Sequence, residues 1–169
     1  MKISIQKRKL SSLESKILEA ETMDFIHTGF TSQHIWQKYF PVYVMAAGNK
    51  LIGIVNIVGL NEWMKIGPVV ILAKYQGKGY GGKILKHVVS DMKNNNLYIG
   101  SSNPYIWRIV EGLGFERLDN YLKLPREIKI YLLKYFLERL NFEFIINEAK
   151  KIREKKRTKY RFYARKILG

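Results

Sequence analysis

The spacing of hydrophobic and polar residues predicts strands and helices in mixed order along the chain. Ile3 and Ile5 alternate with polar residues, which indicates a first strand. Ser11 or Ser12 can cap the helix that follows, because apolar residues recur behind them at helical spacing. A second helix is expected after Thr31.

Three apolar runs in the middle of the chain predict neighbouring strands. Residues 42–46 and 51–58 flank the turn formed by Gly48, Asn49 and Lys50, which indicates a β-hairpin. Residues 64–72 form the third apolar run, and we expect them to extend the same sheet.

Helical and extended segments alternate after this run. Residues 84–92 carry one apolar helical face, and consecutive asparagines end it. Residues 97–100 predict a short strand. Asn103 and Pro104 then supply a capping side chain and a proline at the first helical position, and the glycines that follow end this helix.

The last third of the chain predicts a strand, a helical segment and a closing strand. We expect residues 115–124 to be extended, residues 125–157 to be helical, and residues 160–164 to be extended because aromatic residues alternate with arginine. No repeat or linker divides the chain. The pattern therefore predicts one α/β domain over residues 1–169, with a mixed central sheet flanked by helices and a helical insertion at 125–157.

Positive charge is large and unevenly placed. Thirty Lys and Arg residues against fourteen Asp and Glu residues give a formal charge of +16. Between Lys150 and Lys166 there are ten basic residues, and Glu154 is the single acidic one. This balance favours anionic partners such as coenzyme A, nucleic acid or acidic lipid.

Several classes of protein are excluded by residues that the chain lacks. It has no cysteine, so a disulfide framework, a cysteine zinc site and a thiol nucleophile are impossible. His27, His34 and His87 lack metal-ligand spacing, so no metal is expected and packing is the simpler role for each. No apolar stretch approaches the roughly 18 residues of a membrane span, and the first residues lack the apolar core of a signal peptide. We therefore expect a soluble, cytoplasmic protein that does not enter membranes.

A glycine-rich loop, YQGKGYGGK at residues 75–83, lies between a predicted strand and a predicted helix, where backbone N–H groups and the helix dipole favour an anion. It nearly fits a nucleoside-triphosphate loop, but Ile84 stands where a Ser or Thr must bind magnesium. It also contains G-x-G-x-x-G, but residues 97–102 lack the acidic residue of a dinucleotide site. A tight turn without a ligand is an equal alternative when the glycines are taken alone.

A third loop pattern, Q/R-x-x-G-x-G/A, is met by Gln76, Gly79 and Gly81. Residues 67–81 resemble the stretch of GNAT acyltransferases that runs from their fourth strand into the pyrophosphate loop. Asn103 and Phe115, at identical spacing, resemble the ends of the family's N-x-x-A-x-x-x-Y-x-x-x-G-F helix. Two motifs in the correct order identify a resemblance to the GNAT superfamily over residues 51–115.

The resemblance implies a site for acetyl-CoA or another acyl-CoA. In GNAT proteins the fourth and fifth strands splay apart, and the pantetheine arm pairs with the fourth strand as an added strand. Pro68 cannot donate to a ladder, so we expect a sheet irregularity beside it. Asn103 is expected near the thioester. The strand residues expected to pair with pantetheine are Val69, Val70, Ile71 and Leu72, and the residues expected to hold the pyrophosphate are Gln76, Gly77, Lys78, Gly79, Tyr80, Gly81 and Gly82.

The resemblance also suggests catalytic residues for attack of an amine on the thioester. The N–H of Val70 or Ile71 is the expected oxyanion donor. Glu62 is the candidate base, with a solvated turn residue as the simpler alternative. Val110 replaces the tyrosine that commonly protonates the thiolate in the family, and Tyr105 is the substitute we name, with Tyr80 and Tyr121 as further candidates.

The combined prediction is an acyl-CoA-dependent N-acyltransferase, most simply an N-acetyltransferase. The basic segment between Lys150 and Lys166 predicts an acceptor that is nucleic acid or a protein associated with it, with a solvated helix or a homodimer surface as the alternatives. Because Val110 breaks the family pattern, a catalytically weak or inactive GNAT-shaped nucleic-acid-binding or regulatory protein is the competing prediction.

Overall fold

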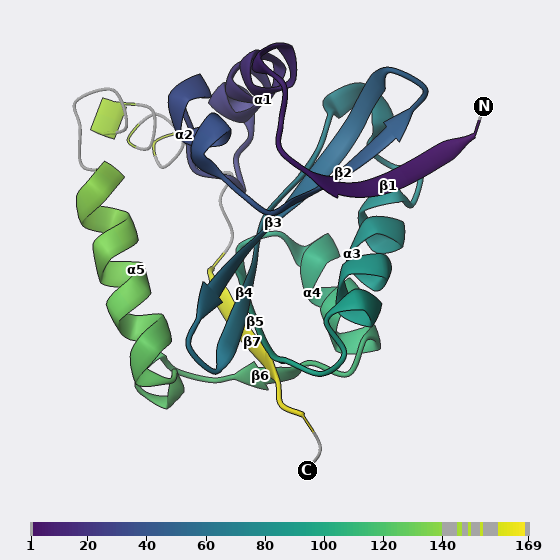
Figure 1. Cartoon of the computed structure of the whole chain (residues 1–169). Helices are drawn as coiled ribbons and strands as arrows, with labels where there is room; N and C mark the ends of the chain where they lie inside the picture. Colours follow the sequence, from purple (N-terminus) through teal and green to yellow (C-terminus); the bar gives the residue numbers. More distant parts are fainter. Residues whose placement is uncertain (1, 140–144, 147–148, 150–152, 154–158, 168–169) are drawn as a thin grey trace.

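A mixed sheet organises the computed structural model, which describes residues 2–139, 145–146, 149, 153 and 159–167. Its strands lie in the order β1-β2-β3-β4-β5-β7-β6 (Figure 1). Only β4 and β5 run parallel to each other among the described strand pairs. The strands are β1 (Ile3–Arg8), β2 (Val42–Ala47), β3 (Lys50–Leu60), β4 (Trp63–Ile71), β5 (Asn96–Ser101), β6 (Glu116–Leu118) and β7 (Arg161–Arg165).

Helices cover both faces of this sheet (Figure 1). One face packs against α3 and α4, and the other packs against α1 and α2 at one end and α5 at the other. The apolar face predicted for residues 84–92 is confirmed, because Ile84, Leu85 and Val88 of α3 are fully buried. The helices are α1 (Ser12–Asp24), α2 (Gln33–Lys38), α3 (Tyr80–Asp91), α4 (Pro104–Gly112) and α5 (Arg126–Arg139).

The predicted start of α1 is confirmed in detail. Ser11 is the N-cap, and its hydroxyl accepts a hydrogen bond from the backbone N–H of Glu14, whose carboxylate accepts one from the N–H of Ser11. The same carboxylate binds both terminal nitrogens of Arg8 at 2.6 and 2.8 Å. The hydrogen-bonded guanidinium of Arg8 lowers the pKa of Glu14 below its ordinary value. This contact ties the end of β1 to the beginning of α1.

The strand predicted at residues 115–124 is much shorter in the structure. Only Glu116–Leu118 is extended, and Tyr121–Lys123 forms a 3₁₀ turn, η2. The cause is Asn120, whose side-chain oxygen accepts a hydrogen bond from the N–H of Lys123 at 3.0 Å. The prediction was wrong there because a local side-chain bond competes with the ladder.

The closing strand β7 lies between β5 and β6, as the alternation at residues 160–164 suggested. The segment α5 is therefore inserted between β6 and β7. Most of the predicted helical insertion beyond residue 139 lies outside the described residues. No described helix is long and apolar enough to span a membrane.

Candidate active site

The fourth and fifth strands separate partway along their length. β4 pairs with β5 only as far as Ile66, which lies opposite Ile99. The next residues are Gly67, with φ of 114°, and Pro68, which has no N–H for a ladder. The register against β3 shifts at the same place, so β4 contains a bulge. The irregularity predicted beside Pro68 is confirmed, and beyond it a gap opens between β4 and β5.

Beyond the bulge, the backbone of β4 presents alternate N–H groups to this gap. The N–H of Leu72 donates to the carbonyl of Ile52 in β3 at 3.0 Å. Because hydrogen-bonding directions alternate along an antiparallel strand, Val70 also faces β3, whereas Val69 and Ile71 face the gap. Of the two donors predicted for an oxyanion, Val70 is therefore used by the ladder.

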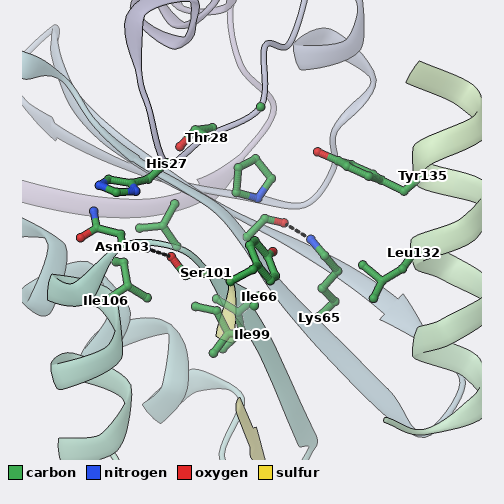
Figure 2. Close-up of a pocket in the computed structure, with 16 residues that line it drawn as sticks. His27, Thr28, Lys65, Ile66, Ile99, Ser101, Asn103, Ile106, Leu132 and Tyr135 are labelled. Atoms are coloured by element: carbon green, nitrogen blue, oxygen red, sulfur yellow. Dashed lines mark hydrogen bonds between the residues drawn. The ribbon is translucent and has the colours of Figure 1, made fainter. Parts of the chain in front are cut away.

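A cavity of about 190 Å³ fills the gap at the bulge (Figure 2). Since β4 and β5 do not pair there, side chains from both faces of the sheet reach it. His27 and Asn103 lie on one side of it, and Lys65 and Tyr135 lie on the other (Figure 2). Further wall residues are Thr28, Gly67, Pro68, Val69, Gly100, Ser101, Ile106, Leu132 and Tyr160.

The glycine loop follows the end of β4 and leads into α3 through the short 3₁₀ turn η1 (Ala73–Tyr75). The side-chain amide of Gln76 donates to the carbonyl of Ile71 at 2.9 Å, so it fastens the loop to the end of β4. Lys78 is exposed, and its ammonium lies 5.8 Å from the ring centre of Tyr75.

Two glycines give this loop its shape. Gly77 and Gly79 have φ values of 74° and 75°, in the left-handed region that favours glycine. Gly79 is the N-cap of α3, and its carbonyl accepts the first helical hydrogen bond, from the N–H of Lys83. The N–H groups of Tyr80, Gly81 and Gly82 precede that bond and have no intrahelical acceptor. The loop therefore has the geometry of an anion site, and its role in coenzyme binding stays a prediction.

Asn103 is placed at the cavity, as its predicted role requires. It is the N-cap of α4, and its side-chain oxygen accepts a hydrogen bond from the N–H of Tyr105 at 2.9 Å. The N–H of Asn103 donates to the hydroxyl of Ser101, which holds the end of β5 against the start of α4. One side chain thus starts the helix and contributes to the cavity wall.

The two predicted catalytic residues are not brought to the cavity. Glu62 is exposed in the turn between β3 and β4, five residues before Gly67, which is roughly 16 Å along a strand. Tyr105 is 70% exposed on the first turn of α4, and the guanidinium of Arg108 lies 4.8 Å from its ring centre. The hairpin length and the direction of the helix turn therefore separate both residues from the gap.

The family's tyrosine position is part of the core in this chain. Val110 is fully buried on α4 and packs with α3 and the sheet. Of the substitutes considered from the sequence, Tyr80 packs against Tyr75 and Tyr121 packs against Phe162. None of these tyrosines is among the described residues that line the cavity.

Residues that the sequence did not single out for chemistry occupy the cavity wall instead. His27 comes from the loop between α1 and α2, and its Nδ1 lies 3.1 Å from the hydroxyl of buried Ser102. Lys65 is 9% exposed, and its ammonium donates to the carbonyl of Gly67 at 2.9 Å. The sequence spacing of His27 and Lys65 gives no sign that they are neighbours, because they come from a loop and a strand that only the folded chain brings together.

Two tyrosine hydroxyls converge over Gly100 in β5. A Cβ built on Gly100 would lie 2.9 Å from the hydroxyl of Tyr160 and 3.0 Å from that of Tyr98. Tyr160 lines the cavity, whereas Tyr98 is fully buried behind it. Burial raises the pKa of the Tyr98 hydroxyl well above its ordinary value, so this phenol stays protonated.

Part of the basic segment between Lys150 and Lys166 is described. The guanidinium of Arg161 lies 3.8 Å from the ring centre of Trp107, and that of Arg165 lies 5.8 Å from the ring centre of Phe115. These two cations pack on the fold's own aromatic rings. The residues 150–152 and 154–158 lie outside the described part of the chain. Within the described part, no three His, Asp or Glu residues form a group that could hold a metal ion.

Comparison with solved structures places this architecture among acetyltransferases. N-acetylglutamate synthase from Neisseria gonorrhoeae, complexed with coenzyme A and N-acetyl-glutamate, has a TM-score of 0.67 at 14% identity; the alignment covers 100% of this chain and 36% of that one. The chain thus spans about a third of that protein. The ribosomal-protein-S18-alanine N-acetyltransferase from Escherichia coli has a TM-score of 0.63 at 13% identity, covering 99% and 96% of the two chains. At these identities the likeness shows the fold.

A search among curated proteins found no match. The sequence does match the family model described as Acetyltransferase (GNAT) family, over residues 10–115. That range runs from the end of β1 through the gap, the glycine loop and α4, and it covers more than half of the chain. The chain therefore belongs to the acetyltransferase (GNAT) family of enzymes.

Proposed function

We propose that this protein transfers the acetyl group of acetyl-CoA to a primary amine. The observation that carries the proposal is the gap between β4 and β5. There a cavity meets the free edge of β4, and the strand leads directly into a glycine loop and a helix N-terminus. The start of α3 suits a diphosphate, the edge of β4 suits an extended ligand, and the cavity has room for the reacting groups.

The chain has room for the coenzyme along this surface. A Cβ on Gly77, Gly79 or Gly82 would meet no atom within 4 Å, so a ligand can approach the loop backbone closely. The N–H groups of the first turn of α3 suit a diphosphate. The outward C=O group of Val69 and the outward N–H group of Ile71 suit the amides of pantetheine. The coenzyme, when bound, supplies an activated thioester, and the fit of these residues to it supports the proposal.

The acceptor amine must lose a proton when it attacks, and we assign its removal to His27. Histidine is the side chain best suited to accept a proton near neutral pH. His27 lies on the cavity wall opposite Lys65, and the buried hydroxyl of Ser102 orients its ring. Glu62, in the distant turn, has no part in this assignment.

Negative charge on the reacting carbonyl oxygen requires a fixed donor. Val69 meets the requirement, because its backbone N–H faces the gap and the residue lines the cavity. Ile71 also faces the gap but is not among the described residues of the cavity wall. We therefore assign the oxyanion contact to the N–H of Val69.

The departing thiolate needs a proton to complete the transfer. Val110 cannot supply one, and we assign this role to the hydroxyl of Tyr160 on the cavity wall. Because a thiolate is a good leaving group and water can protonate it, replacing Tyr160 by Phe should slow transfer without abolishing it. A loss at the low end of the roughly 10²- to 10⁴-fold contributed by general acids is expected.

The charge of the chain supports an acceptor that carries negative charge. With a formal charge of +16, nucleic acid or a protein associated with it is the acceptor class that charge alone favours. Binding to DNA or RNA should then weaken as salt rises. Binding that is undetectable at both low and moderate salt would remove nucleic acid from the proposal and leave the transfer reaction intact.

Thiol release provides the direct test, because the chain has no cysteine to react with a thiol reagent. We expect calorimetry to show binding of acetyl-CoA, and thiol release to depend on an added amine. His27→Gln should lower kcat by roughly 10²- to 10⁴-fold with unchanged coenzyme affinity. His34→Gln, at an exposed position on α2, is the matched control.

Two results would count against the proposal in different ways. No heat with acetyl-CoA, longer acyl-CoAs or free CoA would remove the coenzyme site. Tight coenzyme binding without turnover on any amine would instead favour a GNAT-shaped binding or regulatory protein.

A further inference from the structure

A second, larger cavity adjoins the first on the face of the sheet covered by α2 and α5. It has a volume of about 600 Å³, within the roughly 300–1,000 Å³ typical of small-molecule sites. Tyr135 lines both cavities, so its side chain forms a wall that they share. The walls of the larger cavity carry the aromatic rings of Tyr39, Phe40 and Tyr131. An acceptor side chain in this apolar, aromatic groove therefore lies beside the gap between β4 and β5.

Positive charge marks both cavities. Lys65 lies at the inner one and exposed Lys38 at the outer one. No Asp or Glu is among the described residues that line either cavity. The ammonium of Lys65 is held beside the bulge by the carbonyl of Gly67, and the rings of Tyr131 and Tyr135 lie 5.2 and 5.8 Å from it. In this low-dielectric wall, a fixed ammonium strongly favours an anionic group on the acceptor.

The floor of the groove supplies a buried hydrogen-bond acceptor. Asn56 of β3 is 1% exposed, and its Oδ1 is buried without a hydrogen-bond partner in the structure. The register places Asn56 opposite the bulge of β4. Lys65 is paired with Val58, two residues further along β3, so Asn56 and Lys65 are on the same face of the sheet. This oxygen is enclosed by the protein, so it makes the wall of the groove polar without contacting a ligand there.

We propose that the acceptor is a free α-amino acid with an apolar or aromatic side chain, an inference that rests on the transfer reaction proposed above. Its carboxylate is bound by Lys65, its amine points into the inner cavity toward His27, and its side chain lies in the groove beside Tyr39 and Tyr131. An α-amino acid has its amine and carboxylate on the same carbon. It therefore matches the ammonium of Lys65 and the ring of His27, which face each other across the inner cavity.

The reaction is balanced by these groups. A bond forms between the amine nitrogen and the acetyl carbonyl carbon, and the bond from that carbon to sulfur breaks. The amine attacks in its neutral form, after its extra proton has gone to solvent. Its nitrogen then gives one proton to His27, the sulfur takes one from Tyr160, and proton exchange with solvent restores both side chains. The products are an N-acetylated amino acid and free coenzyme A, and no oxidant or further reactant is needed.

Matched pairs of acceptors provide the test: phenylalanine against phenethylamine, and leucine against 3-methylbutylamine. Each pair differs only by the carboxylate. With the full chain and saturating acetyl-CoA, we expect kcat/KM for the amino acid to exceed that for its decarboxylated partner by at least 50-fold. Lys65→Met, which keeps a long apolar stem in a buried site, should reduce that ratio to near one, whereas Lys65→Arg should retain most of it. Lys93→Met, at an exposed position after α3, should leave the ratio unchanged.

Binding gives a readout that does not depend on turnover. In the presence of free CoA, calorimetry should show phenylalanine binding to the wild type at least tenfold more tightly than to Lys65→Met. Coenzyme affinity should be the same in both proteins, which also shows that the variant is folded.

The outcomes separate the two proposals. Turnover of amines with no preference for the carboxylate, or acetylation of nucleic-acid or protein amines but not of amino acids, overturns the amino-acid inference and leaves acetyl transfer standing. Absence of coenzyme binding in the wild type overturns both.

Discussion

The left-handed glycines of the loop permit a prediction in which strain and ligand binding are measured separately. Gly79 has φ of 75° and Gly48, in the turn between β2 and β3, has φ of 56°. A Cβ at either position would meet no atom within 4 Å, so no neighbouring group blocks an alanine at either one. The two positions differ in one respect: Gly79 caps α3 within the proposed coenzyme loop, and Gly48 lies in a distant hairpin.

Strain should lower the stability of Gly79→Ala and Gly48→Ala by similar amounts. A left-handed conformation costs an alanine roughly 1–2 kcal/mol. Loss of unfolded-state entropy offsets about 0.4–1 kcal/mol of that cost. The free energy of unfolding should therefore fall by about 1 kcal/mol in each variant, or about 2–4 °C in Tm for a chain of this size. Urea denaturation would measure both.

Coenzyme affinity should distinguish the two variants. In Gly79→Ala the new Cβ stands in open space beside the N–H groups of the helix start, and the loop loses its preferred conformation. Loss of one hydrogen bond to a charged phosphate costs about 1.5–3 kcal/mol, which is about a 10- to 100-fold weaker Kd for CoA. Gly48→Ala should bind CoA as the wild type does.

Calorimetry at constant ionic strength, on protein that refolds reversibly, compares the CoA affinity of the two variants. Equal CoA affinity in the two variants, despite equal losses of stability, would refute the placement of the diphosphate at this loop. Weaker binding in both would show that strain acts on the whole fold.

Three further changes test other contacts. Gly53→Ala should lower the free energy of unfolding by about 1–3 kcal/mol, because its Cβ would collide with the carbonyl of Val70 in the adjacent strand, and urea denaturation checks this. Glu14→Gln should cost about 0.5–1 kcal/mol at pH 7 by removing the charge paired with Arg8. The pKa of Glu14 is lowered in the folded state, so its stabilising contribution is present above its ordinary pKa of 4.5 and is lost as pH falls through the folded-state pKa. The free energy of unfolding of the two proteins should therefore differ at pH 7 and converge at pH 2. An equal difference at both pH values would contradict this prediction. Gly100→Ala should displace a tyrosine ring from the cavity wall and lower kcat with little change in CoA affinity; unchanged kcat would show that this wall is dispensable.

Local patterns in the sequence predicted most elements of the fold. The cap at Ser11, the hairpin around Gly48 and the helix starting after Asn103 depend on residues a few positions apart, and the structure confirms each. Pro68 likewise predicted the bulge, because a proline cannot donate to a ladder whatever surrounds it. The apolar pattern of residues 115–124 predicts a strand, but the side chain of Asn120 caps a 3₁₀ turn there and ends the extended segment.

The candidate site was only partly predictable for a physical reason. The glycine loop and Asn103 are contiguous motifs whose backbone geometry follows from nearby residues. The walls of the cavity come from residues far apart in the chain; His27 and Ser102, for example, are 75 positions apart in the sequence and lie in contact. In the sequence, Lys65 and Asn56 are indistinguishable from ordinary strand residues, and strand register is what places them beside the cavities. Glu62 is the best candidate carboxylate in the sequence, and the length of the hairpin is what separates it from the gap.

The sequence by itself therefore determined the order of elements, the loop that can bind an anion and the family. Tertiary structure decided which side chains face the gap, because strand register, the bulge and the packing of α5 set those directions through contacts that no local pattern encodes.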